Sequence, residues 1–518
     1  MLHLPEFRNE PYLDFTKADN RRSMEAAIED VRSQLGREYE LLISGKREKT
    51  GSLLKSVNPS RPAELVGAHH KANAELAQSA VEDAFDYFPE WSATEPVKRV
   101  EMLLRAASIL RKRKLEFNAW LSFEAGKTWP EAEAETAEAI DFCEYYARQM
   151  LRFLPAPAPV QMPGERDEVR YLPLGVGVII PPWNFALAIL AGMTTAALVT
   201  GNTVIVKPSS ETPIIAHKFA EVLLEAGFPG RSFSLMVGSG AEVGDLIVTH
   251  PKTRFISFTG SRDVGLRINE LAAKPQKGQI WIKRVIAEMG GKDAIVVDRD
   301  VDVDTAAHGV MISAFGYQGQ KCSACSRAIV DEAIYDEFVQ KLKDKIATLK
   351  VGPTDNPENY MGPVISAGAQ KTILEYIEHG KREGTLLTGG GVASGDGYFL
   401  QPTVFGDIDR DDKLFQEEIF GPVLAVTKAK DFDHALELAN DTEYGLTGAV
   451  YTNDREKIEK ARDKFFVGNL YINRKCTGAM VGAHPFGGFN MSGTDSKAGG
   501  PDYLLQFLQA KSIAEKIS

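Results

Sequence analysis

The sequence predicts an α/β protein with two doubly wound open-sheet domains, and three observations lead to this fold class. The chain has 518 residues, of which 44% are hydrophobic and 25% charged, an ordinary globular composition with room for two or three folding units. Short buried strands alternate with helices over residues 176–258, which predicts a parallel sheet covered on both faces. A second alternating series over residues 295–472 predicts a second domain of the same class.

The elements before and within the first series follow from hydrophobic spacing. Residues 1–40 predict a helical extension, because Met24, Ile28, Val31 and Leu35 recur at helical intervals. Further helices are predicted at 72–88, 96–123 and 130–152, and the acidic start of the third complements its dipole. The proline-alternating run 155–159 should be extended. We then expect strands at 176–180, 203–206, 232–236 and 255–258, and helices at 186–199, 214–226 and 243–249.

The second series is predicted in the same way. Strands are expected at 295–297, 326–330, 423–427 and 469–472. Helices are expected at 303–317, 335–349, 370–383, 432–439 and 455–465. We find no internal repeat and no low-complexity tract.

Composition excludes several classes of protein. A net charge of −11 argues against a surface that coats nucleic acid, and four cysteines do not form an extracellular disulfide framework. The first residues lack the pattern of a secretory or mitochondrial leader. Residues 171–206 carry no charge, but Pro181 and Pro182 and several polar residues interrupt them, so we expect a buried strand–turn–helix–strand rather than a membrane span. These features predict a cytoplasmic protein with neither nucleic-acid nor membrane partners.

Two glycine turns and one lysine are candidates for a nucleotide site. Gly238, Gly240 and Gly244 follow a strand, but their spacing is one residue longer than the usual dinucleotide motif, so a plain glycine turn is an equal alternative. The Gly260-Ser261 turn would present backbone N–H groups and a hydroxyl at a helix N-terminus, where a phosphate could bind. Lys207 ends a strand, where open α/β sheets bind ligands, although a lysine taken alone is more often a surface charge.

Cys322 has three possible roles on its local sequence. It is a buried structural thiol, a metal or redox thiol paired with Cys325, or a nucleophile. No second pair of ligands accompanies Cys322 and Cys325, so we expect no metal. A nucleophile needs an oxyanion donor and a base, for which Asn184 and Glu288 are candidates. Glu288 precedes a Gly-Gly pair and is either a solvated strand-end charge or a carboxylate where backbone approaches a ligand.

Eight motifs occur in a familiar order. They are Pro182-Trp-Asn184-Phe, Val206-Lys-Pro-Ser, Phe258-Thr-Gly-Ser261, Glu288-Met-Gly-Gly-Lys, Gly319-Gln-Lys-Cys322, Glu418-Ile-Phe420-Gly-Pro-Val, Asn440-Asp-Thr-Glu-Tyr-Gly-Leu and Pro485-Phe-Gly-Gly. By this order, from about Leu42 onward, the chain is identified as a member of the aldehyde dehydrogenase superfamily. The motifs around Cys322, 473–482 and 492–504 resemble the subgroup that oxidises L-glutamate γ-semialdehyde, formed from 1-pyrroline-5-carboxylate in the second step of proline degradation.

The resemblance implies a specific architecture. It predicts an aldehyde dehydrogenase-like fold with a Rossmann-type NAD(P)-binding domain, a catalytic thiol domain and a small β oligomerisation flap. We expect an N-terminal extension at 1–40, a cofactor domain at 41–154 and 173–286, and a catalytic domain at 287–477. Segments 155–172 and 490–518 would mediate assembly into a homo-oligomer.

The resemblance also implies residue roles. Cys322 would form a thiohemiacetal and then a thioester, Asn184 and the Cys322 backbone N–H would hold the oxyanion, and Glu288 would activate water. NAD would be held by Lys207 at the adenosine ribose, Ser261 at the pyrophosphate and Glu418 at the nicotinamide ribose. The remaining predicted cofactor contacts are Ile180, Pro182, Trp183, Ser210, Gly240, Gly244, Phe258, Gly260 and Phe420.

A small-molecule substrate with both a carboxylate and an ammonium needs polar anchors, since a purely apolar tunnel would desolvate them. The subgroup implies Ser323, Gly478 and Ala479 for the carboxylate. Phe185 and Phe486 would line the aliphatic part, and Glu138 would lie near the ammonium.

Two positions depart from common family patterns. Ser210 stands where NAD-specific relatives have a ribose-binding Glu, so we expect NADP to be accepted as well. Cys325 places a second thiol near Cys322, which would make the enzyme sensitive to oxidation.

Other functions remain open on sequence grounds. The same fold could oxidise a different carboxylated semialdehyde, transfer the acyl group to coenzyme A, or serve as a non-catalytic binding protein. A cofactor-independent cysteine hydrolase would leave both phosphate-suited turns unexplained.

Overall fold

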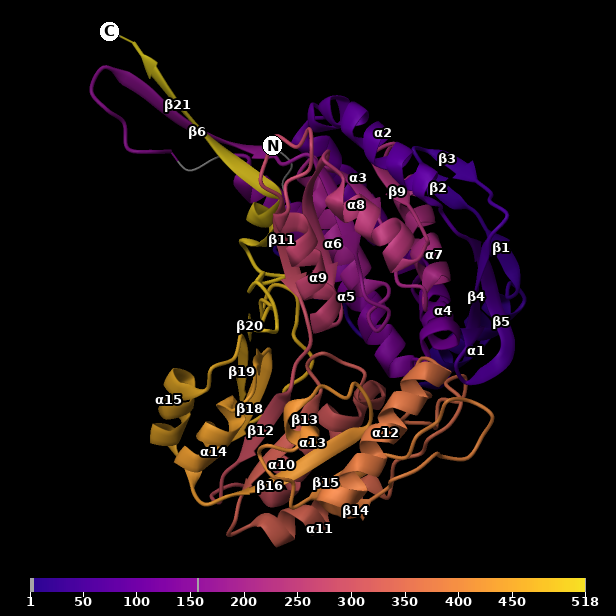
Figure 1. The fold of residues 1–518 in the computed structure, drawn as a ribbon, viewed down its shortest axis with the longest axis vertical. Coiled ribbons are helices and arrows are strands. Elements are labelled where there is room, and N and C mark those ends of the chain that lie inside the picture. Colours follow the sequence, from indigo (N-terminus) through magenta and orange to yellow (C-terminus); the bar gives the residue numbers. More distant parts are fainter. Residues whose placement is uncertain (1–3, 156–157, 518) are drawn as a thin grey trace.

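The computed structural model describes residues 4–155 and 158–517 and contains two seven-stranded sheets, one in each of two domains (Figure 1). The sheet of the first domain has the order β11-β10-β7-β8-β9-β2-β3. Its parallel strands are β7 (Val176–Ile180), β8 (Thr203–Val206), β9 (Phe233–Leu235), β10 (Thr253–Thr259) and β11 (Arg284–Glu288). The short strands β2 (Leu41–Ile43) and β3 (Lys46–Glu48) extend one edge in antiparallel pairing.

Helices cover both faces of this sheet, which is why its central strands are almost wholly apolar. Side chains alternate between faces along a strand. Val204 and Val206 therefore join the core beneath one helical layer, while Ile205 joins the core beneath the other. The first layer contains α3 (Pro96–Lys112), α4 (Lys114–Ala125), α5 (Trp129–Phe153), α6 (Ala188–Val199) and α7 (Pro213–Glu225). The second contains α2 (Ala74–Ser92), the π-helical turn Gly240–Gly244, α8 (Asp245–Thr249) and α9 (Arg262–Ala273).

The second sheet is built by the same rule and has the order β14-β15-β16-β13-β12-β18-β19. Its strands are β12 (Asp293–Val297), β13 (Cys325–Asp331), β14 (Thr385–Thr388), β15 (Thr403–Gly406), β16 (Val423–Ala429), β18 (Thr447–Tyr451) and β19 (Asn469–Ile472). One face packs on α10 (Val303–Phe315) and α11 (Tyr335–Ile346). The other packs on α12 (Ala367–Glu383), α13 (Lys413–Gln416), α14 (Phe432–Asn440) and α15 (Arg455–Lys464).

Three small sheets complete the described chain. Strands β1 (Arg37–Tyr39), β4 (Leu53–Asn58) and β5 (Arg61–His70) form one, and β17 (Tyr444–Gly445) and β20 (Phe489–Asn490) form another. Strand β6 (Glu165–Pro173) pairs antiparallel with β21 (Leu508–Lys516). This two-stranded ribbon projects from the body of the molecule, with the C-terminus near its tip (Figure 1). A short 3₁₀ helix, Tyr503–Phe507, leads into β21.

The predicted fold class and the β-α alternation of both domains are confirmed. The prediction for residues 1–40 is wrong in part, because within the described residues 4–40 only α1 (Ala18–Arg32) is helical and residues 4–14 cross the surface without regular structure. The helix predicted at 96–123 is two helices, divided at Arg113, whose φ of −99° and ψ of 16° interrupt the helical path. The predicted extended run 155–159 includes residues 156–157, which lie outside the described residues.

Residues 171–206 form β7, the following loop, α6 and β8, as the strand–turn–helix–strand interpretation predicts. In the described part of the chain, none of the helices combines the length and apolar character that a membrane crossing requires.

Candidate active site

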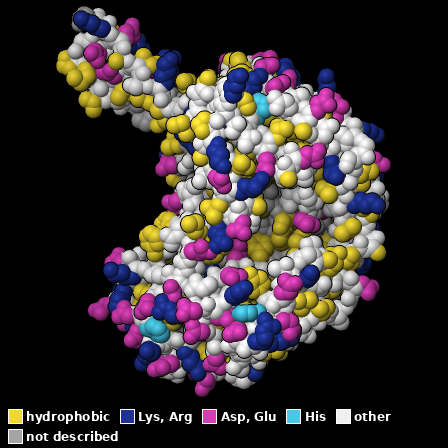
Figure 2. Space-filling model, in the orientation of Figure 1, with side chains coloured by type: hydrophobic (Ala, Val, Ile, Leu, Met, Phe, Trp, Pro, Cys, Tyr) yellow, Lys and Arg dark blue, Asp and Glu magenta, His cyan; other side chains and the backbone are white. Residues whose placement is uncertain are grey.

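A cavity of about 630 Å³ lies between the two domains. Figure 2 shows the hollow between them, with hydrophobic side chains at its floor. The first domain contributes the carboxyl ends of β7, β8, β10 and β11, which is where open α/β sheets bind ligands. The second contributes Cys322, residues 418–420 and the first turns of α12. Most of the wall is apolar, with a few polar groups spaced along it.

Cys322 reaches this cavity through a tight turn after α10. The predicted helix 303–317 ends instead at Phe315, because Tyr317 and Gln318 have positive φ values of 51° and 56°. Side chains hold the turn in place: the Tyr317 hydroxyl donates to the Ala125 carbonyl at 2.9 Å, and Gln318 Nε2 donates to the Pro363 carbonyl at 2.8 Å. Positive φ values strain residues other than glycine, so this turn needs support from the surrounding structure. The turn therefore delivers the thiol to the cavity from a rigid base.

The Cys322 thiol lies in an environment that favours its neutral form. Burial raises its pKa well above the ordinary value, and the nearby carboxylates of Asp293, Glu418 and Glu288 raise it further. A hydrogen bond from the Ser323 backbone acts in the opposite direction. The resting residue is thus a thiol, and a reaction at its sulfur requires removal of a proton.

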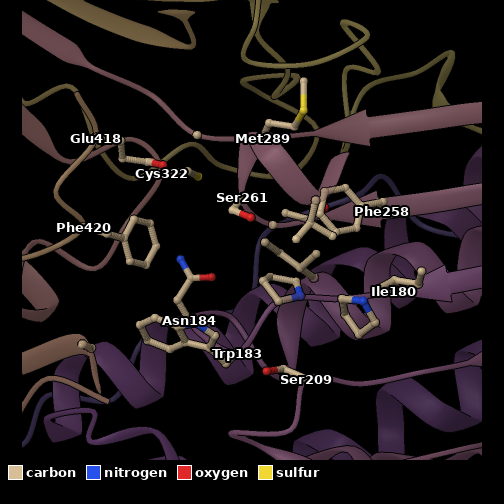
Figure 3. A pocket seen from close by; sticks show the side chains of 18 of the residues that line it. Ile180, Trp183, Asn184, Ser209, Phe258, Ser261, Met289, Cys322, Glu418 and Phe420 are labelled. Atoms are coloured by element: carbon tan, nitrogen blue, oxygen red, sulfur yellow. The ribbon is translucent and has the colours of Figure 1, made fainter. Parts of the chain in front are cut away.

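Asn184 is held beside the thiol loop. It is buried, and its Nδ2 donates to the Gln320 carbonyl at 3.0 Å, which ties the loop after β7 to the turn that carries Cys322. Figure 3 shows the amide directed toward Cys322. An amide N–H fixed at this place can stabilise negative charge on an oxygen bonded to the cysteine's reaction partner.

Glu288, at the end of β11, is nearly buried and does not line the cavity, although the next two residues do. Its Oε1 accepts a hydrogen bond from the Ser496 hydroxyl and another from the Ser496 backbone N–H at 3.3 Å. Its Oε2 has no hydrogen-bond partner among the described residues. Burial raises the pKa of this carboxyl to about 8, despite the lowering effect of both Ser496 bonds.

Gly290 and Gly291 let neighbouring groups come close to the backbone, but these groups belong to the protein itself and not to a ligand. A Cβ on Gly290 would lie 2.2 Å from Glu418 Oε2, and one on Gly291 would lie 2.5 Å from the Cys322 carbonyl oxygen. Glu418 Oε1 accepts the Gly291 N–H at 3.0 Å, and burial raises the pKa of Glu418 to about 7. The glycine pair therefore lets Glu418 and the thiol loop meet beside the cavity.

Nine of the predicted cofactor residues line the cavity together. They are Ile180, Pro182, Trp183, Lys207, Phe258, Gly260, Ser261, Glu418 and Phe420. Figure 3 places Cys322 and Glu418 at one side, with Ile180 and Phe258 at the other. Trp183 and Phe420 meet edge to face with ring centroids 5.5 Å apart.

Two polar side chains in this wall are available to a ligand. Lys207 is buried without an ion-pair partner in the described chain, and burial lowers the pKa of its ammonium group. Ser261 stands at the N-cap of α9, yet its hydroxyl makes no capping bond to the described helix. A phosphate at this helix end would be favoured by the free backbone N–H groups and the helix dipole.

Three predicted cofactor residues lie outside the cavity wall. Ser210 is exposed, and its neighbour Ser209 lines the cavity instead. Gly240 and Gly244 bound the π-helical turn, and a Cβ on Gly244 would lie 3.6 Å from Lys207 Cε. The turn thus packs near the lysine stem rather than forming the wall itself.

None of the predicted substrate residues lines this cavity. The Ser323 carbonyl accepts from the Cys476 thiol at 3.3 Å, so the thiol loop touches the segment that leads to Gly478 and Ala479. Phe486 pairs with Ala498 through backbone hydrogen bonds. Glu138 lies on α5, where burial raises the pKa of its carboxyl to about 8 and the Glu135 charge adds to the effect.

Sequence reasoning missed a buried ion pair behind this site. Lys127 Nζ lies 2.8 Å from Glu135 Oε2, and both side chains are fully buried. Glu135 Oε1 accepts the backbone N–H groups of Leu187 and Ala188 at 2.7 and 3.2 Å, and Lys127 Nζ lies 4.1 Å from the centre of the Phe185 ring. The pair therefore fixes the loop that carries Asn184.

A signal for this pair was present in the sequence. Glu131, Glu133 and Glu135 alternate, so on a helix they cannot all face solvent, although their acidity alone predicted only a favourable interaction with the dipole. Glu133 and Glu135 are both buried. Ser496, which holds Glu288, lies in the 492–504 motif, but no role was predicted for it.

Comparison with known proteins agrees with this geometry. The aldehyde dehydrogenase family model matches residues 46–513. A 1-pyrroline-5-carboxylate dehydrogenase of Geobacillus thermodenitrificans is 58% identical over 98% of this chain and 99% of its own length. The enzyme of that name from Bacillus subtilis is 54% identical over 98% of this chain and 99% of its own length.

Solved structures give the same result. A Thermus 1-pyrroline-5-carboxylate dehydrogenase with bound NAD is similar with a TM-score of 0.98 at 48% identity, covering 99% of this chain and 100% of that one. A Staphylococcus aureus betaine aldehyde dehydrogenase in complex with NAD⁺ has a TM-score of 0.88 at 28% identity, covering 96% of this chain and 98% of that one. The chain belongs to the aldehyde dehydrogenase family.

Proposed function

We propose that this chain oxidises L-glutamate γ-semialdehyde, the open-chain form of 1-pyrroline-5-carboxylate, to L-glutamate with NAD⁺. The observation that carries the proposal is the position of Cys322 beside Asn184 at one side of a dinucleotide-sized cavity. Full-length relatives at 54–58% identity are 1-pyrroline-5-carboxylate dehydrogenases, which supports this substrate.

The residues of the cavity suit NAD. Lys207 and the strand-end loop would hold the adenosine ribose, the Ser261 hydroxyl and the α9 N-terminus would hold the pyrophosphate, and Glu418 would hold the nicotinamide ribose. Ile180, Phe258 and Val264 offer apolar walls. NAD⁺, when bound, supplies the hydride acceptor. Ser210 brings no carboxylate to this region, so NADP is expected to be accepted as well.

The first half of the reaction takes place at Cys322. Its sulfur bonds to the aldehyde carbon, and the carbonyl oxygen becomes an oxyanion held by Asn184 Nδ2 and the Cys322 backbone N–H. Each such donor contributes about 3 kcal/mol to stabilising this charge. Loss of a hydride from the same carbon leaves a thioester on Cys322. Because the resting thiol is neutral, its proton must pass to a nearby base before the bond forms.

The second half of the reaction depends on Glu288. With a pKa of about 8, its carboxylate is basic enough to take a proton from water and is still partly ionised at neutral pH. The resulting hydroxide attacks the thioester carbon and releases the carboxylic acid from the Cys322 sulfur. This base favours hydrolysis over transfer of the acyl group to coenzyme A.

The substrate's own charges need partners on the side of Cys322 away from the cofactor. We assign Ser323, Gly478 and Ala479 to the carboxylate, because a hydroxyl and backbone N–H groups can bind it without steric obstruction. Glu138 is assigned to the ammonium group. Phe185 and Phe486 would contact the aliphatic chain.

The test is NADH formation with a panel of aldehydes. Glutamate semialdehyde should give the highest kcat/KM, well above succinic semialdehyde and a neutral aldehyde such as pentanal, and NADP should support measurable turnover. Equal activity across the panel would reject the substrate while leaving the aldehyde dehydrogenase chemistry in place. A Cys322→Ala variant that still oxidised aldehydes would reject the mechanism.

We also propose a cytoplasmic homo-oligomer. The four cysteines are free, as expected for a reducing compartment. The ribbon of β6 and β21 exposes Leu172, and Ile517 is exposed directly after β21. Val160 and Met162 lie exposed in the segment that leads into β6. Isolated two-stranded ribbons are only marginally stable in water, so a second subunit is the natural cover for this one.

A further inference from the structure

Residues 5–15 precede the first helix and follow one face of α5 in the opposite direction. Four contacts fix their path. They are Pro5 carbonyl to Arg148 Nε at 3.0 Å, Glu10 N–H to Asp141 Oδ1 at 2.7 Å, Leu13 N–H to Glu133 Oε1 at 2.8 Å, and the Phe15 ring to the Trp129 ring at 5.5 Å. Residues 129, 133, 141 and 148 recur at helical spacing along one stripe. The segment is thus held along the helix that carries Glu138.

The same segment also contacts the loop 478–482. Asn9 Nδ2 donates to the Val481 carbonyl at 3.0 Å and to Asp141 Oδ2 at 2.8 Å, so one amide joins this loop to α5. The Phe7 ring packs on Gly482, where an added Cβ would lie 3.1 Å from the ring. The Tyr12 hydroxyl lies 3.5 Å from Met480 Sδ.

The loop needs an external support. Gly478 and Gly482 both have positive φ, at 78° and 81°, so its backbone is fixed by contacts and not by side-chain sterics. Immobilising a loop before a ligand arrives lowers the entropic cost of binding. Asn9 is the residue that bonds to the loop and to α5 at once.

Tyr12 contacts the 478–482 loop through Met480, and the charge of Glu138 acts on its phenol. Its side chain is 54% exposed, which leaves the phenol accessible at this edge. After burial, Glu138 is the largest influence raising the pKa of the Tyr12 phenol, ahead of Asp141, Glu131 and Glu133. The hydroxyl therefore lies at the 478–482 loop, within electrostatic reach of the carboxylates of α5, and can donate to a substrate carboxylate or accept from an ammonium group.

We propose that residues 5–15 form the outer clamp of the substrate site, in which Asn9 is a positioning residue for the 478–482 loop and Tyr12 a specificity-determining residue for the α-amino acid end of the aldehyde. This inference rests on the proposed function, because it takes Gly478, Ala479 and Glu138 as the substrate's anchors. The clamp acts on recognition of the charged end and leaves the chemistry at Cys322 unchanged.

The test compares Asn9→Ala, Tyr12→Phe and the control Thr16→Ala in the full-length enzyme. Thr16 is exposed, and its hydroxyl bonds only to Asp14 among the described residues. Loss of one or two hydrogen bonds should raise KM for glutamate semialdehyde about five- to ten-fold in Asn9→Ala and about three-fold in Tyr12→Phe. KM for pentanal, KM for NAD and kcat should change less than about two-fold in both variants, since the uncharged aldehyde and the cofactor make no use of the clamp.

The outcomes separate the two proposals. A parent enzyme that does not prefer glutamate semialdehyde over pentanal rejects the proposed function. A parent that shows this preference, with variants that keep it in full, rejects the clamp alone. A KM that rises equally for both aldehydes also rejects the clamp, because it indicates a purely structural role. Tyr12→Phe removes only a hydroxyl from a half-exposed residue and keeps the ring. It therefore still tests the clamp if Asn9→Ala fails to fold.

Discussion

At the scale of single residues, the buried carboxyl of Glu288 shows how the environment alters the basicity of a side chain. Its Ser496 partner favours the ionised form, yet burial outweighs this effect and raises the pKa to about 8. A carboxyl on the protein surface would be too weak a base to activate water efficiently. The same burial thus places Glu288 within the range where it can both take and return a proton.

Replacing Glu288 tests its role as the base. Glu288→Gln should reduce steady-state turnover by about 10²- to 10⁴-fold, because an amide cannot accept the proton from water. Thioester formation should still occur, so rapid mixing should show a burst of NADH close to one equivalent of active sites. Cys322→Ala serves as the control without any burst. Slow turnover in Glu288→Gln without a burst of NADH would instead mean that Glu288 acts in a step before the thioester forms.

The raised pKa also predicts how stability depends on pH. Between about pH 4.5 and pH 8 the folded protein retains a proton on Glu288 that the unfolded chain releases. The free energy of unfolding therefore falls as pH rises through this window. Below pH 4.5 the stabilisation that comes from the raised pKa of Glu288 is fully present. Glu288→Gln removes this dependence, so its melting temperature relative to the parent should rise by about 2 °C or more between pH 5 and pH 9.

The measurement is differential scanning calorimetry of both proteins across that pH range. The exposed carboxylate variant Glu332→Gln is the matched control and should follow the parent at every pH. Parallel curves for Glu288→Gln and the parent would mean that Glu288 is ionised in the folded state throughout.

Motifs led to Cys322, Asn184 and nine cofactor candidates that share one cavity, although their roles remain predictions. The residues that sequence reasoning missed act over long sequence separations. Ser496 reaches Glu288 across 208 residues, and Glu135 reaches Leu187 across 52. A local pattern holds no information on such pairs, because only the packed fold brings them together.

At the scale of elements, the Gly290-Gly291 pair after β11 determines how closely the two domains' loops approach. Gly291 faces the Cys322 carbonyl, which is backbone and cannot rotate away. Gly291→Ala should therefore displace the thiol loop and reduce kcat at least about ten-fold, since small misplacements at a reacting centre are costly. Steady-state kinetics with circular dichroism would separate this effect from misfolding.

Gly51→Ala provides the control for this substitution. Gly51 is exposed, and an added Cβ there would meet no heavy atom within 4 Å. Its kinetics should match the parent. Unchanged kcat in Gly291→Ala would show that the thiol loop tolerates displacement.

Most central strands and long helices could be predicted from the sequence, because both faces of each sheet are buried and the apolar runs are unmistakable. The errors have more than one cause. Helix α10 ends early because Tyr317 and Gln318 adopt positive φ values, which no residue preference predicts. Strands β4 and β5 were not predicted, since the alternating sequences of small edge sheets give a weak signal, and the buried strands β15 and β18 inside the second sheet were missed as well. The ribbon of β6 and β21 falls largely within segments 155–172 and 490–518, for which the family resemblance implied a small β flap.

At the scale of the whole molecule, the projecting ribbon is the element with the least support from the body (Figure 1). Removing residues 509–518 should leave β6 without its partner and convert the proposed oligomer to smaller species, because nine paired positions are lost or disrupted. Light scattering coupled to size-exclusion chromatography measures this change.

The control for this deletion is Lys511→Ala, which keeps the strand and changes one exposed side chain. It should elute as the parent does. A truncated protein of parental mass would show that the ribbon is not the assembly surface.

The pairing of β6 with β21 also has a consequence for synthesis on the ribosome. Residues 165–173 emerge early, but their partner at 508–516 is translated only after the entire second domain. Until then β6 is a nascent strand with an unsatisfied edge, exposed to neighbouring polypeptides on the same messenger. Its charged sequence, Glu-Arg-Asp-Glu-Val-Arg, discourages premature pairing during that interval.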